Sequence, residues 1–350
     1  MKKVVTIFTV LAMIINITAC GPKTEQRFES SFLELFDTVT TIVGYAPDEK
    51  TFTDYSQLIY NRLEEYHQLY DIYNDYDGVN NIKTINDNAG IKPVKVNQKI
   101  IDLLEFSIQM DQMTNDNVNV AFGAVLSIWH DYRTKGIDDP ISAKLPSMNE
   151  LQGMVKHTDI SKVKIDKEAS TVYLEDPLMR LDVGAIAKGY ATEMTAKYIE
   201  EQGFTNGMIS VGGNVRTIGT KFDEAGTKIP WSVGIQNPDQ ESAQTTVHIL
   251  QLEDMSLVTS GVYERYYTVD GKRYHHIIDP ETLMPSELFQ SVSIVCKDSG
   301  MADALSTSIF NMTLEEGKNL IESLEDTEAF WILNDGTYEY SSGFEAYIRK

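Results

Sequence analysis

The sequence predicts one α+β domain behind a short N-terminal targeting segment. Runs of alternating apolar residues, typical of strands, and longer runs with helical spacing follow one another without the regular strand–helix–strand order of a parallel α/β protein. No repeat of solenoid length and no low-complexity region interrupts them. The chain has 350 residues, of which 42% are hydrophobic, so it can bury a sizeable core.

The N-terminus has the pattern of a bacterial lipoprotein signal. Two lysines precede an apolar run at 4–17, which is short for a transmembrane helix, and a small residue stands directly before Cys20. We expect residues 1–20 to be the signal, ending at a lipidated Cys20, residues 21–30 to be a polar tether, and residues 31–350 to be the folded domain. This predicts a protein anchored by lipid on the extracytoplasmic face of a bacterial cell membrane. An ordinary secretory signal with an incidental cysteine is the alternative.

The net charge and the cysteine content argue against some classes of function and of binding site. The net charge of −22 repels an extended phosphate backbone, which argues against nucleic-acid binding. It does not exclude a small phosphate ligand, because one lysine or a Mg²⁺ ion can override the global field locally. Apart from Cys20 the chain has only Cys296, so no internal disulfide is expected. Cys296 ends an apolar strand pattern and is predicted to be a buried, inert thiol, and no Cys/His cluster offers a zinc site.

The first half of the chain is predicted to begin with a strand and to continue with amphipathic helices. Residues 32–45 are rich in β-branched and aromatic side chains, and Pro47 ends the run. Apolar residues at 53–70 recur at threes and fours, which indicates a helix. The further elements expected are a loop at 71–90, a helix at 97–113, a strand or turn leading into a helix at 118–129, a polar stretch at 135–162 and a strand at 163–173.

The second half is predicted to alternate short strands and turns around a few helices. A helix is expected over 186–202, with Gly203 as its C-cap. The other elements expected are strands at 207–211, 231–235, 247–252, 256–259, 274–278 and 292–295, and helices at 301–310 and 314–324.

Residues 181–193 (Leu-Asp-Val-Gly-Ala-Ile-Ala-Lys-Gly-Tyr-Ala-Thr-Glu) are the stretch around which the rest is interpreted. They predict a short strand that ends on Asp182, turns on glycine and enters a helix. Such a turn points free amides and the positive helix end at a ligand, which suits a phosphate, and Lys188 adds a cation. Neither a P-loop nor a Gly-x-Gly-x-x-Gly motif is present. A tight turn whose glycines serve only the backbone is the alternative.

Two further patterns contain residues that are suited to metal binding or to catalysis. Asp303 and Thr307 are four residues apart on a predicted helix, so their oxygens share one face and suit Mg²⁺. Asp303 as a simple helix N-cap is the alternative. His276 lies in His-Ile-Ile-Asp-Pro and has a side chain whose near-neutral pKa suits a general base, although a lone histidine is more often structural. His275 is expected on the other face of the strand.

Four ordered motifs together resemble the ApbE family, the FAD:protein FMN transferases. The resemblance covers the chain from about Phe32 to near the C-terminus, and it implies a single domain of mixed sheets and flanking helices with an active site in a cleft between two subregions. The four motifs lie at 181–193, at 209–216 (Ile-Ser-Val-Gly-Gly-Asn-Val-Arg), at 259–267 with 276–280, and at 301–310 (Met-Ala-Asp-Ala-Leu-Ser-Thr-Ser-Ile-Phe).

The resemblance implies roles for individual residues. Mg²⁺ would be held by Asp303, Thr307 and the backbone oxygen of Ala185, with His276 and Asp303 as the catalytic residues. Asn119, Ala124 and Asp37 stand where the family commonly has Asp, Pro and Gly, so a carboxylate contact at 119 is lost and the geometry at 37 is in question. The positions that match FAD contacts are Phe36, Tyr73, Val118, Asn119, Val120, Asp182, Lys188, His276 and Ile277.

The implied reaction is attack by a Thr or Ser hydroxyl of a target protein on the FMN-side phosphorus of FAD, with release of AMP. The acceptor would carry an Asp-Gly-x-Ser/Thr-Gly-Ala-Thr type motif, which this chain itself lacks. With water in place of the hydroxyl, the same site would be an FAD pyrophosphatase. A non-catalytic flavin-binding lipoprotein would need neither metal nor base, and a solute-binding lipoprotein would show two similar α/β lobes.

Overall fold

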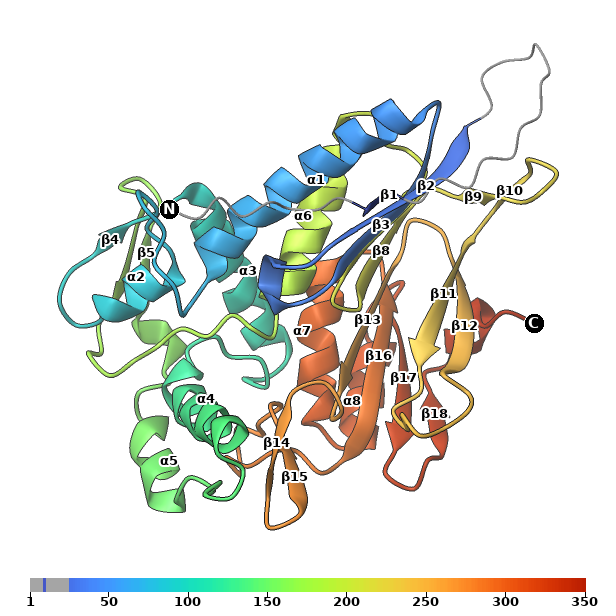
Figure 1. The fold of residues 1–350 in the computed structure, drawn as a ribbon. Helices are drawn as coiled ribbons and strands as arrows, with labels where there is room; N and C mark the ends of the chain where they lie inside the picture. Colours follow the sequence, from blue (N-terminus) through green and yellow to red (C-terminus); the bar gives the residue numbers. More distant parts are fainter. Residues whose placement is uncertain (1–8, 11–24) are drawn as a thin grey trace.

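A nine-stranded antiparallel sheet forms the centre of the protein, seen here in a computed structural model that describes residues 9–10 and 25–350 (Figure 1). Every neighbouring pair of its strands is antiparallel. The α+β class predicted from the sequence is thereby confirmed. In sheet order the strands are β1 (Thr9–Val10), β2 (Gln26–Phe32), β3 (Thr40–Ala46), β7 (Gly207–Val211), β8 (Asn214–Ile218), β13 (Ser256–Gly261), β16 (Phe289–Cys296), β17 (Glu328–Leu333) and β18 (Tyr338–Tyr340).

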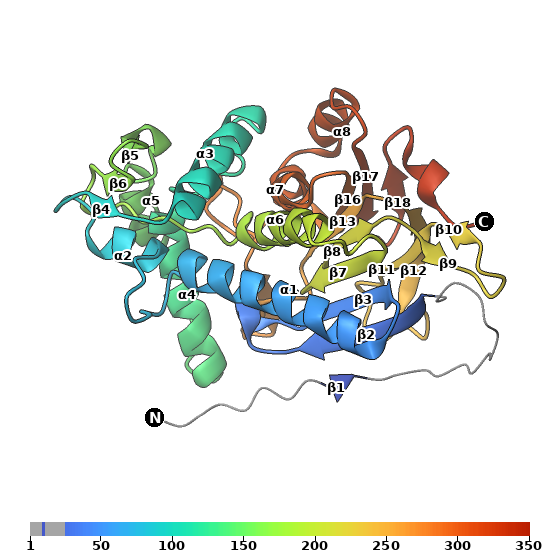
Figure 2. The same ribbon diagram turned by 90° about the horizontal axis from the view of Figure 1, so that it is seen from above.

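Helices cover one face of this sheet (Figure 2). α1 contacts β2 and β3, α6 contacts β7 and β8, α7 lies on β13 and β16, and α8 lies on β17. α1 begins where the Asp48 carboxylate accepts a hydrogen bond from the Thr51 amide, which satisfies a free N–H of the first turn. The bounds are α1 (Glu49–Tyr70), α6 (Ala187–Glu201), α7 (Ser299–Phe310) and α8 (Leu314–Glu322).

A two-stranded sheet covers the opposite face. Its strands are β11 (Trp231–Gln236) and β12 (Thr246–Leu252), which pair antiparallel with Trp231 opposite Leu252. Their apolar side chains form a buried cluster with Phe330 of β17 and with Phe344. A small hairpin of β9 (Lys221–Phe222) and β10 (Lys228–Ile229) precedes them.

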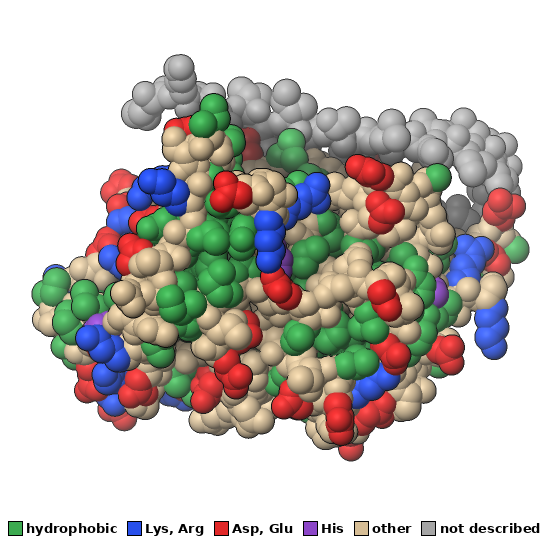
Figure 3. Space-filling view, turned by 90° about the horizontal axis from the view of Figure 1, so that it is seen from below, with side chains coloured by type: hydrophobic (Ala, Val, Ile, Leu, Met, Phe, Trp, Pro, Cys, Tyr) green, Lys and Arg blue, Asp and Glu red, His purple; other side chains and the backbone are tan. Residues whose placement is uncertain are grey.

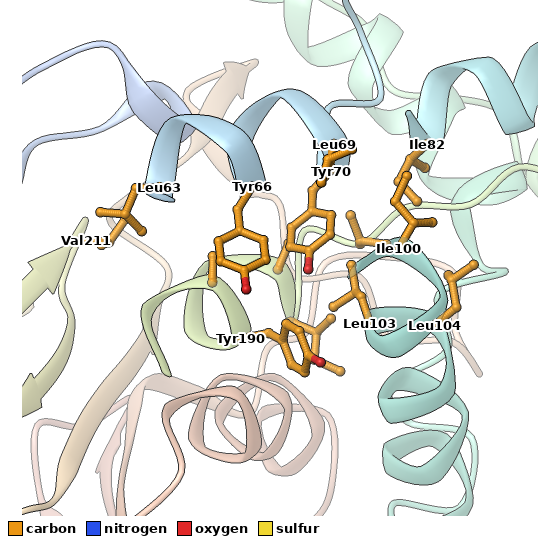
Figure 4. Close-up of a cluster of buried hydrophobic side chains, with 14 of the residues drawn as sticks. Leu63, Tyr66, Leu69, Tyr70, Ile82, Ile100, Leu103, Leu104, Tyr190 and Val211 are labelled. Carbon is orange, nitrogen blue, oxygen red and sulfur yellow. The ribbon is translucent and has the colours of Figure 1, made fainter. Parts of the chain in front are cut away.

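A second, mainly helical subregion lies beside the sheet and its helices (Figure 1). Figure 4 shows how it joins the rest: Tyr66 and Tyr70 of α1, Tyr190 of α6 and Leu103 of α3 meet in one buried cluster. Its elements are α2 (Ile82–Asp87), α3 (Gln98–Met113), α4 (Gly123–Asp138), α5 (Met148–Val155), the three-stranded sheet of β4 (Val94–Lys95), β6 (Thr171–Leu174) and β5 (Val163–Asp166), and the hairpin of β14 (Tyr266–Val269) and β15 (Lys272–His275). Within the described residues, 3₁₀ turns lie at Leu35–Asp37, Ile160–Lys162 and Phe344–Tyr347.

The structure corrects the expected N-terminal boundary of the domain. Residues 26–30 were assigned to the polar tether, but they belong to β2, in which Phe28, Ser30 and Phe32 are buried. Alternate burial of that kind is the strand period of two, which the polar side chains between them obscured. The strand expected over 32–45 is interrupted by the 3₁₀ turn before β3. Cys20 and the rest of the predicted signal, apart from β1, lie outside the described residues.

Other expectations are revised in the same way. No strand forms at Leu181; this segment is a loop, with one isolated bridge between Arg180 and Phe122. The strand expected over 163–173 is the hairpin β5–β6, and the stretches at 71–90 and 135–162 contain α2 and α5. Both short helices start with a reciprocal capping box, a local signal that the polar composition hid.

Two predictions about single features are confirmed. Gly203 follows α6 with a φ of +97°, the left-handed region expected for a helix end. Cys296 is buried, and burial raises the pKa of its thiol to about 12. None of the helices described is long and apolar enough to span a membrane.

Candidate active site

A cavity of about 710 Å³ opens where the helical subregion meets α6, α7 and the central sheet. Residues from all four motif regions line it, together with residues of the loop after α1. Figure 3 shows the underside of the molecule, where hydrophobic side chains gather about a short row of basic and acidic ones with a histidine among them. The sequence-predicted site residues that line the cavity are Phe36, Tyr73, Val118, Asn119, Val120, Asp182, Ala185, Lys188, His276, Ile277, Asp303 and Thr307.

Close contact between α6 and α7 builds the floor of the cavity. The Asp303 carboxylate is buried and accepts a hydrogen bond from the Gly189 amide at 2.8 Å. A Cβ on Gly189 would lie 2.2 Å from the Ser299 carbonyl oxygen and 2.5 Å from the Asp303 Cβ, so only glycine allows this approach. The N-cap interpretation of Asp303 is wrong, because Asp298 caps α7 by accepting from the amides of Gly300 and Met301.

One lysine faces the buried carboxylate. Burial raises the pKa of Asp303, and the nearby Lys188 ammonium opposes that shift. Lys188 Nζ donates to Asn214 Oδ1 at 3.0 Å, which ties the start of α6 to the β7–β8 turn. That turn is made by Gly212 and Gly213, both with positive φ. The floor therefore combines a carboxylate, a hydroxyl on Thr307 and a mobile cation.

The oxygen atoms of this floor fit a hard divalent cation. Asp303 and Thr307 are one helical turn apart, and both line the cavity with Ala185. A buried carboxylate charge needs compensation, which a divalent ion supplies. No group of three or more His, Cys, Asp and Glu side chains with metal-binding spacing occurs among residues 25–350. A cation here would thus rest on one carboxylate with neutral oxygens and water.

The two neighbouring histidines have different surroundings. The His276 Nδ1 lies 3.2 Å from the Arg265 carbonyl oxygen, so Nδ1 carries the proton and Nε2 keeps its lone pair. Burial, followed by the charges of Arg265, His275 and Arg133, lowers the pKa of His276 to about 3. His276 is therefore neutral across the whole physiological range, with a free Nε2 lone pair but a lowered basicity.

His275 is a structural residue. Its Nε2 lies 2.7 Å from the Ser286 carbonyl oxygen, and its Nδ1 accepts from the Ile277 amide at 3.2 Å. Both ring nitrogens are thus used by the backbone. The strand expected over 274–278 ends at His275, so the two histidines do not lie on opposite faces of one strand as predicted, although they have different partners.

The chain is similar to known proteins over most of its length. The sequence profile of the ApbE family matches residues 36–331. The chain belongs to the ApbE family. A relative in Treponema pallidum (strain Nichols), named FAD:protein FMN transferase, is 31% identical over 77% of this chain and 75% of its own length.

Solved structures of the ApbE family have the same fold. The ApbE protein of Thermotoga maritima superposes with a TM-score of 0.79 at 27% identity, over 93% of this chain and all (100%) of its own. The flavin transferase ApbE of Vibrio cholerae superposes with a TM-score of 0.75 at 25% identity, over 92% of this chain and 99% of its own.

At the rim of the cavity, two residues of this ApbE-family chain that are not glycine have a left-handed backbone conformation. Phe36 and Asp37 have φ of +54° and +53°, the left-handed region, which answers how Asp37 is accommodated where glycine is common. The Phe36 amide donates to His67 Nδ1 at 3.2 Å, and the other His67 nitrogen lies 3.1 Å from the Tyr76 hydroxyl. Tyr76 in turn donates to Asp71 at 2.7 Å. A polar chain therefore holds the strained turn against the end of α1.

Asn119, at the position where the resemblance implies Asp, uses both ends of its side-chain amide. Its Nδ2 donates to the Thr158 carbonyl oxygen at 3.0 Å, and its Oδ1 accepts from the Ala121 amide at 2.7 Å. A carboxylate cannot donate to Thr158, so the amide is needed to hold this loop. Val120 continues the loop and accepts from the Asp182 amide at 2.8 Å.

Sequence reasoning missed several polar residues of the cavity, including three that carry or can carry positive charge. These three are His130 and Arg133 of α4 and Arg265 of the turn before β14. His130 and Arg133 are three residues apart on α4 and so share a face, but α4 runs to Asp138, beyond residue 129 where the expected helix was placed. Burial lowers the pKa of Arg133, and within the described part of the chain no carboxylate lies within ion-pair distance of it.

Proposed function

We propose that this chain transfers FMN from FAD to a Thr or Ser hydroxyl of a target protein and releases AMP. The acceptor oxygen would bond to the FMN-side phosphorus, the P–O bond of the pyrophosphate would break, and its electron pair would leave with AMP. One observation carries the proposal: a buried carboxylate, a lysine and a neutral histidine line the same cavity of a protein in the ApbE family. Relatives in Klebsiella pneumoniae (strain 342) and Treponema pallidum named FAD:protein FMN transferase support it.

His276 would act as the general base. Its Nδ1 proton is held by the Arg265 carbonyl, so Nε2 is the atom that can take the acceptor proton. The low pKa keeps the ring neutral before the reaction. The imidazolium formed during transfer would lie near two arginines, so its proton would pass on readily to solvent.

Asp303, Thr307 and the Ala185 carbonyl would hold Mg²⁺. When bound, Mg²⁺ neutralises charge on the pyrophosphate and aligns it for in-line displacement. Lys188 would orient a phosphate oxygen from the start of α6, where free amides and the helix dipole also favour an anion. Arg133 and Arg265 would add positive charge at the opposite side of the cavity.

The place of action is part of the proposal. The signal pattern that ends at Cys20 supports a lipid-anchored protein on the extracytoplasmic face of a bacterial membrane, with an acceptor of the Asp-Gly-x-Ser/Thr-Gly-Ala-Thr type. Metabolic labelling with a palmitate analogue tests it. Wild type should carry the label and Cys20→Ala should not.

The transfer itself is tested by mass spectrometry. Wild type is incubated with FAD, Mg²⁺ and a protein carrying the acceptor motif, and the acceptor should gain the mass of FMN on one Thr or Ser. AMP release without any added mass would replace the transferase by an FAD pyrophosphatase. Tight FAD binding with neither product would point to a flavin-carrying lipoprotein.

A further inference from the structure

Three separate segments are joined by one histidine at the cavity mouth. The Tyr73 hydroxyl, in the loop after α1, lies 2.9 Å from His130 Nδ1. The Nε2 atom of the same ring lies 3.5 Å from Asp182 Oδ2. The other Asp182 oxygen accepts from the Gly184 amide at 2.8 Å. Tyr73 is thus linked through His130 to the turn that enters α6.

The tautomer of His130 follows from its neighbours. Burial lowers the pKa of His130, and Arg133 and Arg265 act in the same direction, while the Asp182 carboxylate opposes them. In the neutral ring, one nitrogen donates and the other accepts. Both ring nitrogens of His130 have a partner if the Tyr73 hydroxyl donates to Nδ1 and the Nε2 proton faces the Asp182 carboxylate.

The Tyr73 ring has little else to fix it. Its backbone is held, because the Tyr73 amide donates to Asp71 Oδ1 at 2.6 Å. The residue is nevertheless 56% exposed, whereas large side chains of a packed core are held by neighbours on all sides. The ring orientation therefore depends on His130, which contacts both the hydroxyl and the ring, with ring centroids 5.8 Å apart.

We propose that His130 is a positioning residue that sets the Tyr73 ring at the cavity mouth for contact with the flavin, with Asp182 fixing the histidine from the other side. The inference rests on the proposed function, since the flavin is the ligand that the ring would meet. His130 also lines the cavity, so the test has to separate its effect through Tyr73 from a direct contact of its ring with FAD.

A double-mutant cycle in FAD binding tests the linkage. Tyr73→Phe and His130→Ala should each raise the Kd for FAD about 3- to 10-fold, the range expected for one hydrogen bond. The double variant should bind no worse than the weaker single variant, because both changes remove the same interaction. His130→Gln, whose side-chain oxygen can accept from Tyr73, should recover part of the affinity, and His130→Ala should raise the KM for FAD more than it lowers kcat.

A matched control is available outside the cavity. His157 also pairs with a carboxylate, with its Nδ1 2.9 Å from Asp176, and His157→Ala should leave FAD affinity unchanged. Fold-changes that multiply in the double variant, or single variants that bind as wild type does, would overturn the proposal.

A measurement without flavin separates this inference from the proposed function. Imidazole ¹⁵N chemical shifts of the free protein should report His130 protonated on Nε2, and Tyr73→Phe should move its Nδ1 signal. If that signature is present but wild type binds no FAD, the proposed function fails while the Tyr73–His130 contact stands. If FAD binds and the signature is absent, the function stands and the positioning role fails.

Discussion

The floor and the rim of the cavity are built in opposite ways. On the floor, Asp303 is 4% exposed and lies on a regular helix that meets α6 at a glycine. On the rim, Tyr73 is 56% exposed and Phe36 has a left-handed backbone, and both lie in irregular segments held by side-chain hydrogen bonds. The difference teaches that fixed charges are placed by helix packing, whereas contacts to the ligand rings are placed by polar tethers. Substitutions on the floor and on the rim of the cavity should therefore have different effects on activity and stability.

The largest effect is expected at His276, which faces the cavity from the rim side. His276→Asn should still bind FAD and lose FMN transfer by about 10²- to 10⁴-fold, the usual contribution of a general base. His275→Asn should retain kcat and lose thermal stability, because it removes the bond to Ser286. Acceptor mass over time measures transfer, and full activity of His276→Asn would remove it from the mechanism.

The pH dependence of FMN transfer tests the protonation state of His276. A histidine with an unshifted pKa near 6.5 would protonate as the pH falls from 8 to 5 and switch off as a base. The pKa of His276 is lowered to about 3, so it stays neutral over this interval. The rate of FMN transfer at saturating FAD should not fall as the pH drops through 6.5. A fall in rate there that is absent in His276→Asn would contradict the lowered pKa.

On the floor, Asp303→Asn should separate chemistry from folding. Loss of one precisely placed charge should lower transfer by about 10²- to 10³-fold, with the melting temperature kept or raised because a buried charge is removed. Asp298→Ala is the matched control on the same helix: it should lose stability by about 1 kcal/mol as a missing N-cap and keep its activity. Equal Mg²⁺ dependence of AMP release in wild type and Asp303→Asn would exclude Asp303 as a ligand.

Gly189→Ala tests the helix contact that makes the floor rigid. The added Cβ would meet backbone at 2.2 Å, so the helices must separate, at a cost of about 1 to 3 kcal/mol. Gly153→Ala in α5 is the control, since a Cβ there meets nothing within 4 Å and should stabilise the helix by up to about 1 kcal/mol. Calorimetric melting distinguishes the two, and equal melting temperatures would contradict the close contact.

The smallest effect is expected at Asp111, near the end of α3. Burial, helped by Asp116, raises the pKa of Asp111 to about 7, and one of its oxygens is buried with no hydrogen-bond partner in the described structure. The folded state therefore holds this proton more tightly than the unfolded state, so stability falls as the pH rises from about 4 towards 7. Asp111→Asn should melt about 2 to 4 °C above wild type at pH 8, equivalent to ~1 kcal/mol, with the gap closing towards pH 4. A gap independent of pH would show that Asp111 does not titrate in this range.

Much of the fold follows from local pattern. Helical spacing located α1 and α3, and the four-residue spacing of Asp303 and Thr307 put both on one face of α7. Gly203 ended α6 as its conformational freedom predicts. These features depend on neighbours within one or two turns, and the sequence records those neighbours directly.

Other features were decided only by contacts between distant segments. The polar residues 26–30 became a strand because β3 offered it hydrogen bonds and a place to bury Phe28. The expected strand at Leu181 did not form, because its backbone was taken up by Asn86 and Val120 instead. Propensity could not foresee either result, since both depend on partners supplied by the tertiary structure.

The sequence by itself determined which chemical groups this protein has, the order in which they follow one another, and the helix that carries Asp303 and Thr307. Only the tertiary structure decided that Gly189 serves the approach of α6 to α7, and that His130 meets both Asp182 and Tyr73, the latter from 57 residues away along the chain. The physical reason is that periodicity records which face of an element is apolar. The partner on the other side of that face is chosen by packing and hydrogen-bond satisfaction across the whole chain.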